Sequence, residues 1–153
     1  MGTRSLTTFI ETHTDRETGK KKKNEIVTMY RQYDGYPSGH GMELAEFLAD
    51  GKVVNGYGLD GGKQFNGMGC LAAQVVAHFK DGVGGFYLQS GNKDSGEEYR
   101  YHVIHDYDKQ TLTIKVIEVG YMNKKDEYVN KTRTLFTGSP TELLKAVEDE
   151  VFA

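Results

Sequence analysis

The densest group of chemically useful side chains lies in one short segment, Tyr30 to Gly41, which reads Tyr-Arg-Gln-Tyr-Asp-Gly-Tyr-Pro-Ser-Gly-His-Gly. Glycines allow a backbone to present its N–H groups, and the start of a helix favours an anion. Tyrosine and arginine side chains offer flat faces for a base or a sugar. The segment therefore predicts a cradle for a nucleotide or a phosphate, although the same residue types also make an ordinary turn from a strand into a helix.

Each residue type in this segment has an expected role in the cradle. Glycine N–H groups would bind phosphate near the start of the following helix, an arginine and a histidine would contact the same phosphate, and tyrosines would stack on a base. The predicted ligand-binding residues are Arg31, Tyr33, Asp34, Gly35, Tyr36, Ser38, Gly39, His40, Gly41 and Tyr57.

No catalytic set accompanies these binding residues in the sequence. The spacing around Ser38 is not that of a nucleophile elbow, and the glycine loops match neither the phosphate-loop pattern nor the dinucleotide-binding pattern. His102 and His105 come nearest to a metal-binding pair, but residues three apart on a strand point to opposite faces. We therefore predict no catalytic residue, no metal site and no cofactor. Asp34 and His40 with a divalent ion support only a third hypothesis, a phosphodiesterase or nuclease.

The composition bounds the class of protein. A length of 153 residues suits one domain spanning residues 1–153, and a formal net charge of −3 argues against duplex DNA as a partner. The single cysteine, Cys70, excludes an intramolecular disulfide and a cysteine-rich zinc module. The N-terminus lacks an apolar signal region, and no stretch approaches the roughly 20 apolar residues of a membrane span. We expect a cytoplasmic protein with no membrane partner.

The elements that must position the cradle follow from hydrophobic periodicity. An α+β fold is expected: a mostly antiparallel sheet of about six strands, a hairpin plus a four-stranded meander, covered by about three helices. Four consecutive lysines, Lys20 to Lys23, lie in the predicted turn of the hairpin, where a solvated turn is favoured over a nucleic-acid finger. The predicted strands are 6–12, 26–33, 85–89, 98–105, 111–119 and 127–136, and the predicted helices are 42–49, 68–80 and 140–152, the last after a capping box at Ser139.

The Tyr30 to Gly41 segment, together with Phe65-Asn66-Gly67-Met68 leading into Cys70-Leu71-Ala72-Ala73, resembles a group of small uncharacterised proteins of bacteriophages and prophages. The similarity covers most of the chain and brings no catalytic signature. It implies a context, because small phage proteins of this kind often counter host defence by binding a nucleotide signal or a host protein. Phage sponge proteins that sequester cyclic or ADP-ribose-type messengers are similar in size, and many are homo-oligomers, so a homo-oligomer in the host cytosol is expected.

Two functions of different kinds follow from these observations. The leading hypothesis is a non-catalytic binding protein for a small nucleotide-derived anion, acting as an anti-defence sponge. The alternative is an inhibitor that binds a host defence protein through its acidic C-terminal helix or through a tyrosine-rich face of the sheet.

Overall fold

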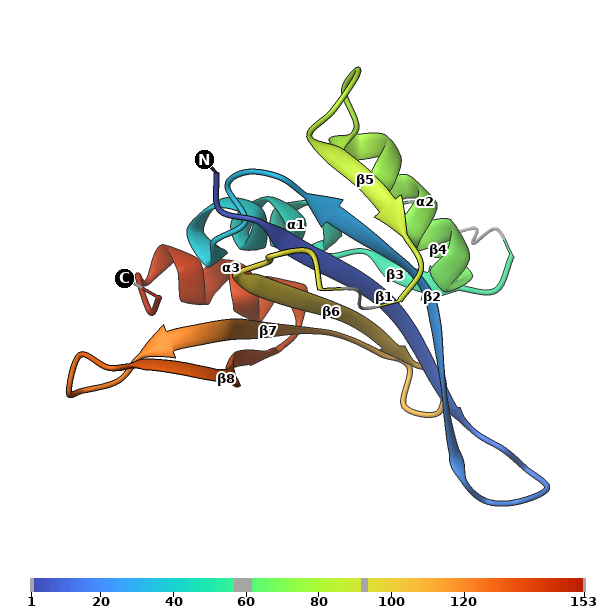
Figure 1. The fold of residues 1–153 in the computed structure, drawn as a ribbon. Coiled ribbons are helices and arrows are strands. Elements are labelled where there is room, and N and C mark those ends of the chain that lie inside the picture. The colour runs from blue at the N-terminus through green and yellow to red at the C-terminus, as the bar shows by residue number, and fades with distance from the viewer. Residues whose placement is uncertain (1, 57–61, 92–93, 153) are drawn as a thin grey trace.

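The structure is a computed structural model, and it describes residues 2–56, 62–91 and 94–152 (Figure 1). The predicted ligand residue Tyr57 lies outside these ranges. In chain order the elements are β1 (Ser5–Thr14), β2 (Lys21–Arg31), a π-helical turn η1 (Pro37–Gly41), α1 (Met42–Leu48), β3 (Lys52–Val54), β4 (Gln64–Asn66), α2 (Gly67–Phe79), β5 (Phe86–Gln89), β6 (Tyr99–Asp106), β7 (Thr111–Met122), β8 (Tyr128–Gly138) and α3 (Pro140–Glu148).

A six-stranded sheet forms the centre of the fold, with the strand order β5-β2-β1-β6-β7-β8. Every neighbouring pair is antiparallel except β1 with β6, which run parallel. The residues Ser5 to Ile10 of β1 are all buried, as suits a strand in the middle of a sheet. The predicted α+β fold with a mostly antiparallel sheet is confirmed.

One strand lies where the sequence did not place it. Strand β5 was expected to begin the C-terminal meander, but it pairs with β2 at the opposite edge of the sheet, so the meander contains only β6, β7 and β8. The reason lies in the side chains. Strand β6 carries Tyr101 and Val103, which are both fully buried, and so it fits the central position beside β1. Strand β5 has only four residues, two of them exposed, and short strands suit a sheet edge.

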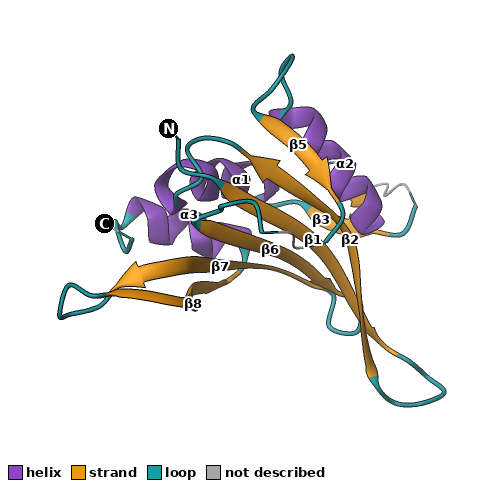
Figure 2. Cartoon of the chain, in the orientation of Figure 1, coloured by secondary structure: helices purple, strands orange, loops and turns teal. Residues whose placement is uncertain are grey.

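Within the described part of the chain, the three α-helices cover one face of the sheet and no helix lies on the other face (Figure 2). Leu44 and Leu48 of α1, Leu71 of α2 and Leu143 of α3 are fully buried in the same core cluster as Phe9. Burying one such side chain stabilises the fold by roughly 1.5–3 kcal/mol, so these contacts hold the helices on the sheet. The described residues include no helix that is both long and apolar enough to cross a membrane.

Three of the four lysines, Lys21 to Lys23, belong to β2 rather than to the hairpin turn, because that strand begins at Lys21. Lys22 Nζ lies 2.9 Å from a carboxylate oxygen of Asp15, and Lys23 Nζ lies 3.6 Å from one of Glu25. These pairs balance much of the local charge, which favours a solvated surface over a nucleic-acid finger.

Candidate functional site

Strand alternation sends Arg31 and Tyr33 to the helix-covered side of the sheet, whereas Tyr30 and Gln32 turn to the open side. Arg31 is only 4% exposed and forms the floor of a cavity of about 520 Å³. We call this cavity the Arg31 pocket. It is lined by Arg31, Tyr33, Glu43, Glu46, Phe47, Lys63, His78, Phe79, Asp81 and Phe86.

Arg31 is held by one carboxylate, one imidazole and several aromatic rings. Its Nη1 donates to Oε2 of Glu43 at 2.8 Å and lies 3.0 Å from Nδ1 of His40. The guanidinium carbon is 5.1 Å from the ring centre of Phe86 and 5.3 Å from that of Tyr33. The Nε–H is buried and has no hydrogen-bond partner in the structure, although buried polar groups are normally paired. The Nη2 group makes a longer contact of 3.5 Å with Oε1 of Glu43, so Glu43 is the main partner of the guanidinium on the pocket side.

His40 supports Arg31 from behind and does not face the pocket. It is fully buried, and its Nδ1 accepts from Arg31, because a guanidinium can only donate. The other nitrogen, Nε2, therefore carries the hydrogen and donates to Oγ1 of Thr7 at 2.7 Å. Burial, and then the nearby charge of Arg31, lower the pKa of His40 to about 3. A neutral, enclosed imidazole positions Arg31, whereas the sequence had assigned it to phosphate.

The glycine N–H groups of the predicted cradle are used within the chain. Gly35 N donates to Thr3 O, and Gly39 N donates to Tyr36 O, both at 2.9 Å. The residues from Pro37 to Gly41 form a π-helical turn that continues directly into α1. The segment is thus an ordered turn that brings α1, and with it Glu43, next to Arg31.

Close packing explains why these positions are glycine. A β-carbon at Gly35 would lie 2.7 Å from the Ser5 β-carbon, and one at Gly39 would lie 2.6 Å from the carbonyl oxygen of Asp34. Neither distance is compatible with a side chain unless the backbone shifts. The loop is therefore fitted against the start of β1.

The remaining predicted residues lie outside the Arg31 pocket. Asp34 is exposed with a left-handed backbone (φ 55°), and its carboxylate accepts from the Tyr36 hydroxyl at 3.3 Å. Ser38 lies in a separate hollow beside Phe152 of the C-terminal segment. Gly41 is buried where α1 begins. Of the predicted residues that the structure describes, it brings Arg31 and Tyr33 together in one cavity.

Several pocket residues were not predicted. His78 of α2 stacks on Phe47 of α1, with ring centres 4.3 Å apart and planes 25° apart, and Lys63 Nζ lies 4.5 Å from the centre of the same Phe47 ring. A usable signal was present in α1, where Glu43, Glu46 and Phe47 have the i, i+3, i+4 spacing of one helix face.

The charges of the pocket restrict what it can bind. Its lining has two cations, Arg31 and Lys63, and three carboxylates, those of Glu43, Glu46 and Asp81. A polyanion would meet repulsion from these carboxylates. A ligand with a single acidic group and several N–H donors matches both signs of charge.

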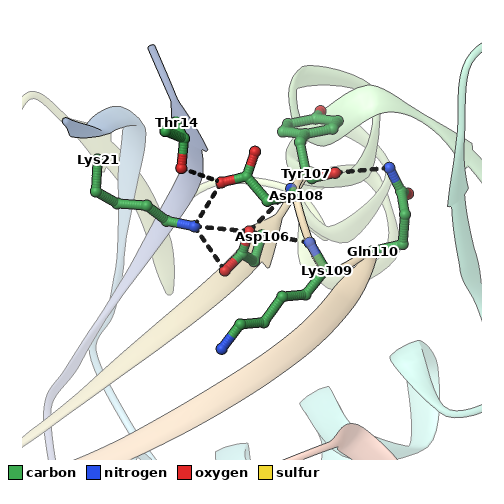
Figure 3. A network of polar contacts seen from close by, with 7 residues as sticks. All are labelled: Thr14, Lys21, Asp106, Tyr107, Asp108, Lys109 and Gln110. Atoms are coloured by element: carbon green, nitrogen blue, oxygen red, sulfur yellow. Dashed lines mark hydrogen bonds and ion pairs between the residues drawn. The ribbon is translucent and has the colours of Figure 1, made fainter. Parts of the chain in front are cut away.

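A second polar cluster joins the β1–β2 hairpin to the β6–β7 turn (Figure 3). Lys21 Nζ lies 2.8 Å from a carboxylate oxygen of Asp106 and 2.8 Å from one of Asp108, which also accepts from Thr14 Oγ1 at 2.7 Å. The bonds from Lys21 and then Thr14 hold the pKa of Asp108 well below its usual range. Because Lys21 and Thr14 already bind these carboxylates, the cluster has a structural role: it links the β1–β2 hairpin to the β6–β7 turn.

Within the described ranges, no group of three or more His, Cys, Asp or Glu side chains is arranged to hold a metal ion. Comparison with known protein families, with curated proteins and with solved structures returns no match to this chain. The Arg31 pocket is therefore the feature of the molecule that best indicates a function.

Proposed function

We propose that this chain is a non-catalytic binding protein for a small nucleotide-derived anionic ligand, and that the ligand occupies the Arg31 pocket. The observation that carries the proposal is the buried Arg31 guanidinium, which lies in the lining of a cavity of about 520 Å³ and is paired there with Glu43. A phosphate or carboxylate oxygen would compete with Glu43 for the Nη groups of the guanidinium. The volume falls in the range of small-molecule pockets, roughly 300–1,000 Å³.

The walls of the pocket suit a planar, donor-rich ring. Tyr33 and the stacked Phe47 and His78 rings offer flat surfaces for a base. The carboxylates of Glu46 and Asp81 are acceptors for ring N–H and amino groups. A purine base with one phosphate near Arg31 satisfies both halves of the pocket better than a nucleoside triphosphate does.

The biological role that we propose is sequestration without turnover. His40, the imidazole nearest Arg31, is enclosed and neutral, so it supports binding instead of exchanging protons with a ligand. Holding a cyclic nucleotide or an ADP-ribose-type signal intact would make the chain a phage anti-defence sponge in the host cytosol. That context, and the homo-oligomeric state proposed with it, come from the sequence resemblance.

The test is to incubate the purified protein with linear and cyclic nucleotides and ADP-ribose derivatives, remove unbound compounds, denature, and identify what is released by mass spectrometry. We expect one intact compound. Tyr33→Ala should lower the retained amount at least tenfold, because Tyr33 lines the pocket and is 44% exposed, so its loss leaves the fold intact. Tyr128→Ala, on a tyrosine of β8 that is 66% exposed, is the matched control. Release of an altered compound would show an enzyme, and no retained compound would overturn the proposal.

A protein-binding inhibitor is the second candidate, and an apolar trough favours it. The trough has a volume of about 500 Å³ and lies between α2 and strands β2 and β5, with Ala73, Val76 and the 57% exposed Leu88 in its lining. Pull-down from a host lysate separates the two functions, because a nucleotide sponge needs no protein partner. A single captured protein that Leu88→Lys no longer captures would favour the inhibitor.

A further inference from the structure

The open side of β2 and β5 carries a second, different hollow. Tyr30 and Tyr87 lie directly opposite each other in the register of these strands, with ring centres 5.9 Å apart and planes tilted by 53°. Together with Gln32, Gln89 and Ser95 they line a shallow hollow of about 390 Å³. We call it the tyrosine hollow.

Among the residues that the structure describes, the lining of the tyrosine hollow contains phenols, amides and a hydroxyl, with no carboxylate and no basic group. Lys80 Nζ lies 5.5 Å from the centre of the Tyr87 ring, outside this lining, and donates to the carbonyl oxygens of Gly84 and Phe86. Sites that bind single-stranded nucleic acid combine stacking aromatic rings with a positively charged groove for the backbone. The described lining, with polar but uncharged groups, therefore favours a neutral ligand over a phosphate-bearing one.

The amide of Gln89 is already oriented. Its Oε1 accepts from Ser95 Oγ at 3.3 Å, and its Nε2 donates to Gly91 O at 3.4 Å. An amide has two N–H donors and two acceptor lone pairs, so one of each is left for a ligand. Beside it, the Gln32 side chain is exposed and adds a second amide. A pre-oriented amide reduces the entropy that binding would otherwise cost.

We propose that the tyrosine hollow binds a ring of a neutral carbohydrate. The C–H face of a pyranose packs on an aromatic ring, and its hydroxyl groups both donate and accept hydrogen bonds, as the amides and phenols here require. The hollow lies on the opposite face of the strands from the Arg31 pocket, so this binding is independent of the nucleotide site.

The test is a calorimetric titration of the wild-type protein with four neutral probes: maltohexaose, cellohexaose, mannohexaose and the hexamer of N-acetylglucosamine. We expect saturable binding of at least one. Tyr87→Ala should weaken it at least tenfold, whereas Tyr87→Trp should preserve it, because tryptophan keeps a stacking face. Tyr87 is 50% exposed, so neither change should shift the melting temperature by more than about 2 °C.

Two controls separate this site from the Arg31 pocket. Tyr33→Ala should leave saccharide affinity unchanged, and Tyr87→Ala should leave nucleotide retention unchanged. The proposal is overturned if none of the four saccharides binds, or if binding survives Tyr87→Ala and Tyr30→Ala together. It is also overturned if the hollow binds only a dodecamer of deoxythymidine, or if Tyr87→Ala abolishes self-association in sedimentation while no saccharide binds.

Discussion

Strands β2 and β5 show two unlike surfaces, one on each side of the same few residues. On the covered side, Arg31 and Phe86 lie under α1 and α2 in a charged cavity. On the open side, Tyr30 and Tyr87 line a shallow hollow whose described lining residues carry no charge. Alternation along a strand is enough to produce both surfaces from consecutive residues.

The difference separates residues by what they do for the fold. Arg31 contacts His40, Glu43 and three aromatic rings, so it serves stability and binding together. Tyr87 is half-exposed, so its contribution to binding can be removed without disturbing the core. Mutation of the buried Arg31 should therefore lower stability as well as binding, whereas mutation of the half-exposed Tyr87 should act mainly on affinity.

The largest effect is expected from Arg31→Ala. It should lower the free energy of unfolding by about 3 kcal/mol, because His40 Nδ1 loses its donor in a buried site and the aromatic frame loses its packing. The neighbouring change Gln32→Ala, on the open side, should stay within about 0.5 kcal/mol. Urea denaturation followed by circular dichroism measures both, and equal losses would remove the contrast between the two sides.

The histidines of the two sides should differ in their effect on acid stability. The folded pKa of His40 is lowered to about 3, so only the unfolded chain takes up a proton near pH 6.5. The stabilisation is complete above that pH and is lost as the pH falls toward 3, at up to about 1.4 kcal/mol per pH unit. Between pH 7 and pH 5 the loss from His40 is therefore about 2 kcal/mol.

On the open side, burial lowers the pKa of His102 to about 4, so its effect has the same sign over a narrower range. His40→Gln, which can accept from Arg31 and donate to Thr7, should flatten the acid slope more than His102→Gln does. Urea unfolding at pH 7 and at pH 5 gives the change in the free energy of unfolding between these pH values. If that change is the same in His40→Gln as in the wild-type protein, His40 is not a buried neutral imidazole.

Glu43→Gln should sharpen the assignment of the covered side. It removes the carboxylate that competes for Arg31, so the compound retained by the wild-type protein should bind about tenfold more tightly, or about 1.4 kcal/mol. Glu46→Gln makes the same change of charge without an Arg31 contact and should weaken binding, because a hydrogen-bond acceptor for the base is lost. Isothermal titration measures both, and parallel shifts would mean that only net charge matters.

The smallest effect is expected from Tyr87→Phe on the open side. It keeps the ring and removes one hydroxyl, so saccharide affinity should fall only about two- to fivefold, or roughly 0.5–1 kcal/mol. The free energy of unfolding should not change measurably. A loss as large as that of Tyr87→Ala would show that the hydroxyl, and not the stacking face, dominates binding.

Periodicity and local chemistry were sufficient for most of the fold. The capping box predicted at Ser139 is present, with its hydroxyl accepting from Glu142 N at 3.1 Å. The pairing of strands that are distant in the sequence was harder to predict. Nothing in the residues Phe86–Gln89 themselves indicates that this strand pairs with β2 instead of β6. Asn66, just before α2, has a residue type that often caps a helix, but its side-chain oxygen accepts from Gly56 N and makes no cap.

The site was predicted only in part, for a physical reason. Arg31 and Tyr33 share a face by strand parity, which the sequence shows directly. Whether a histidine or a glycine N–H points to solvent depends on what packs against it, and the burial of His40 against Tyr101 is a contact between residues 61 positions apart, 101 minus 40. Likewise, His78 reaches Phe47 only after α1 and α2 have docked.

The parallel pairing of β1 with β6 also has a consequence for how the chain folds as it is made. The β1–β2 hairpin can form from residues close in sequence, but β1 acquires its other neighbour only when residues as far as Asp106 are available. Closing so long a loop slows folding, since its entropy must be lost before the contacts form. During synthesis the hairpin must therefore wait, with one edge of its central strand unpaired, until about two thirds of the protein has left the ribosome, 106 of 153 residues.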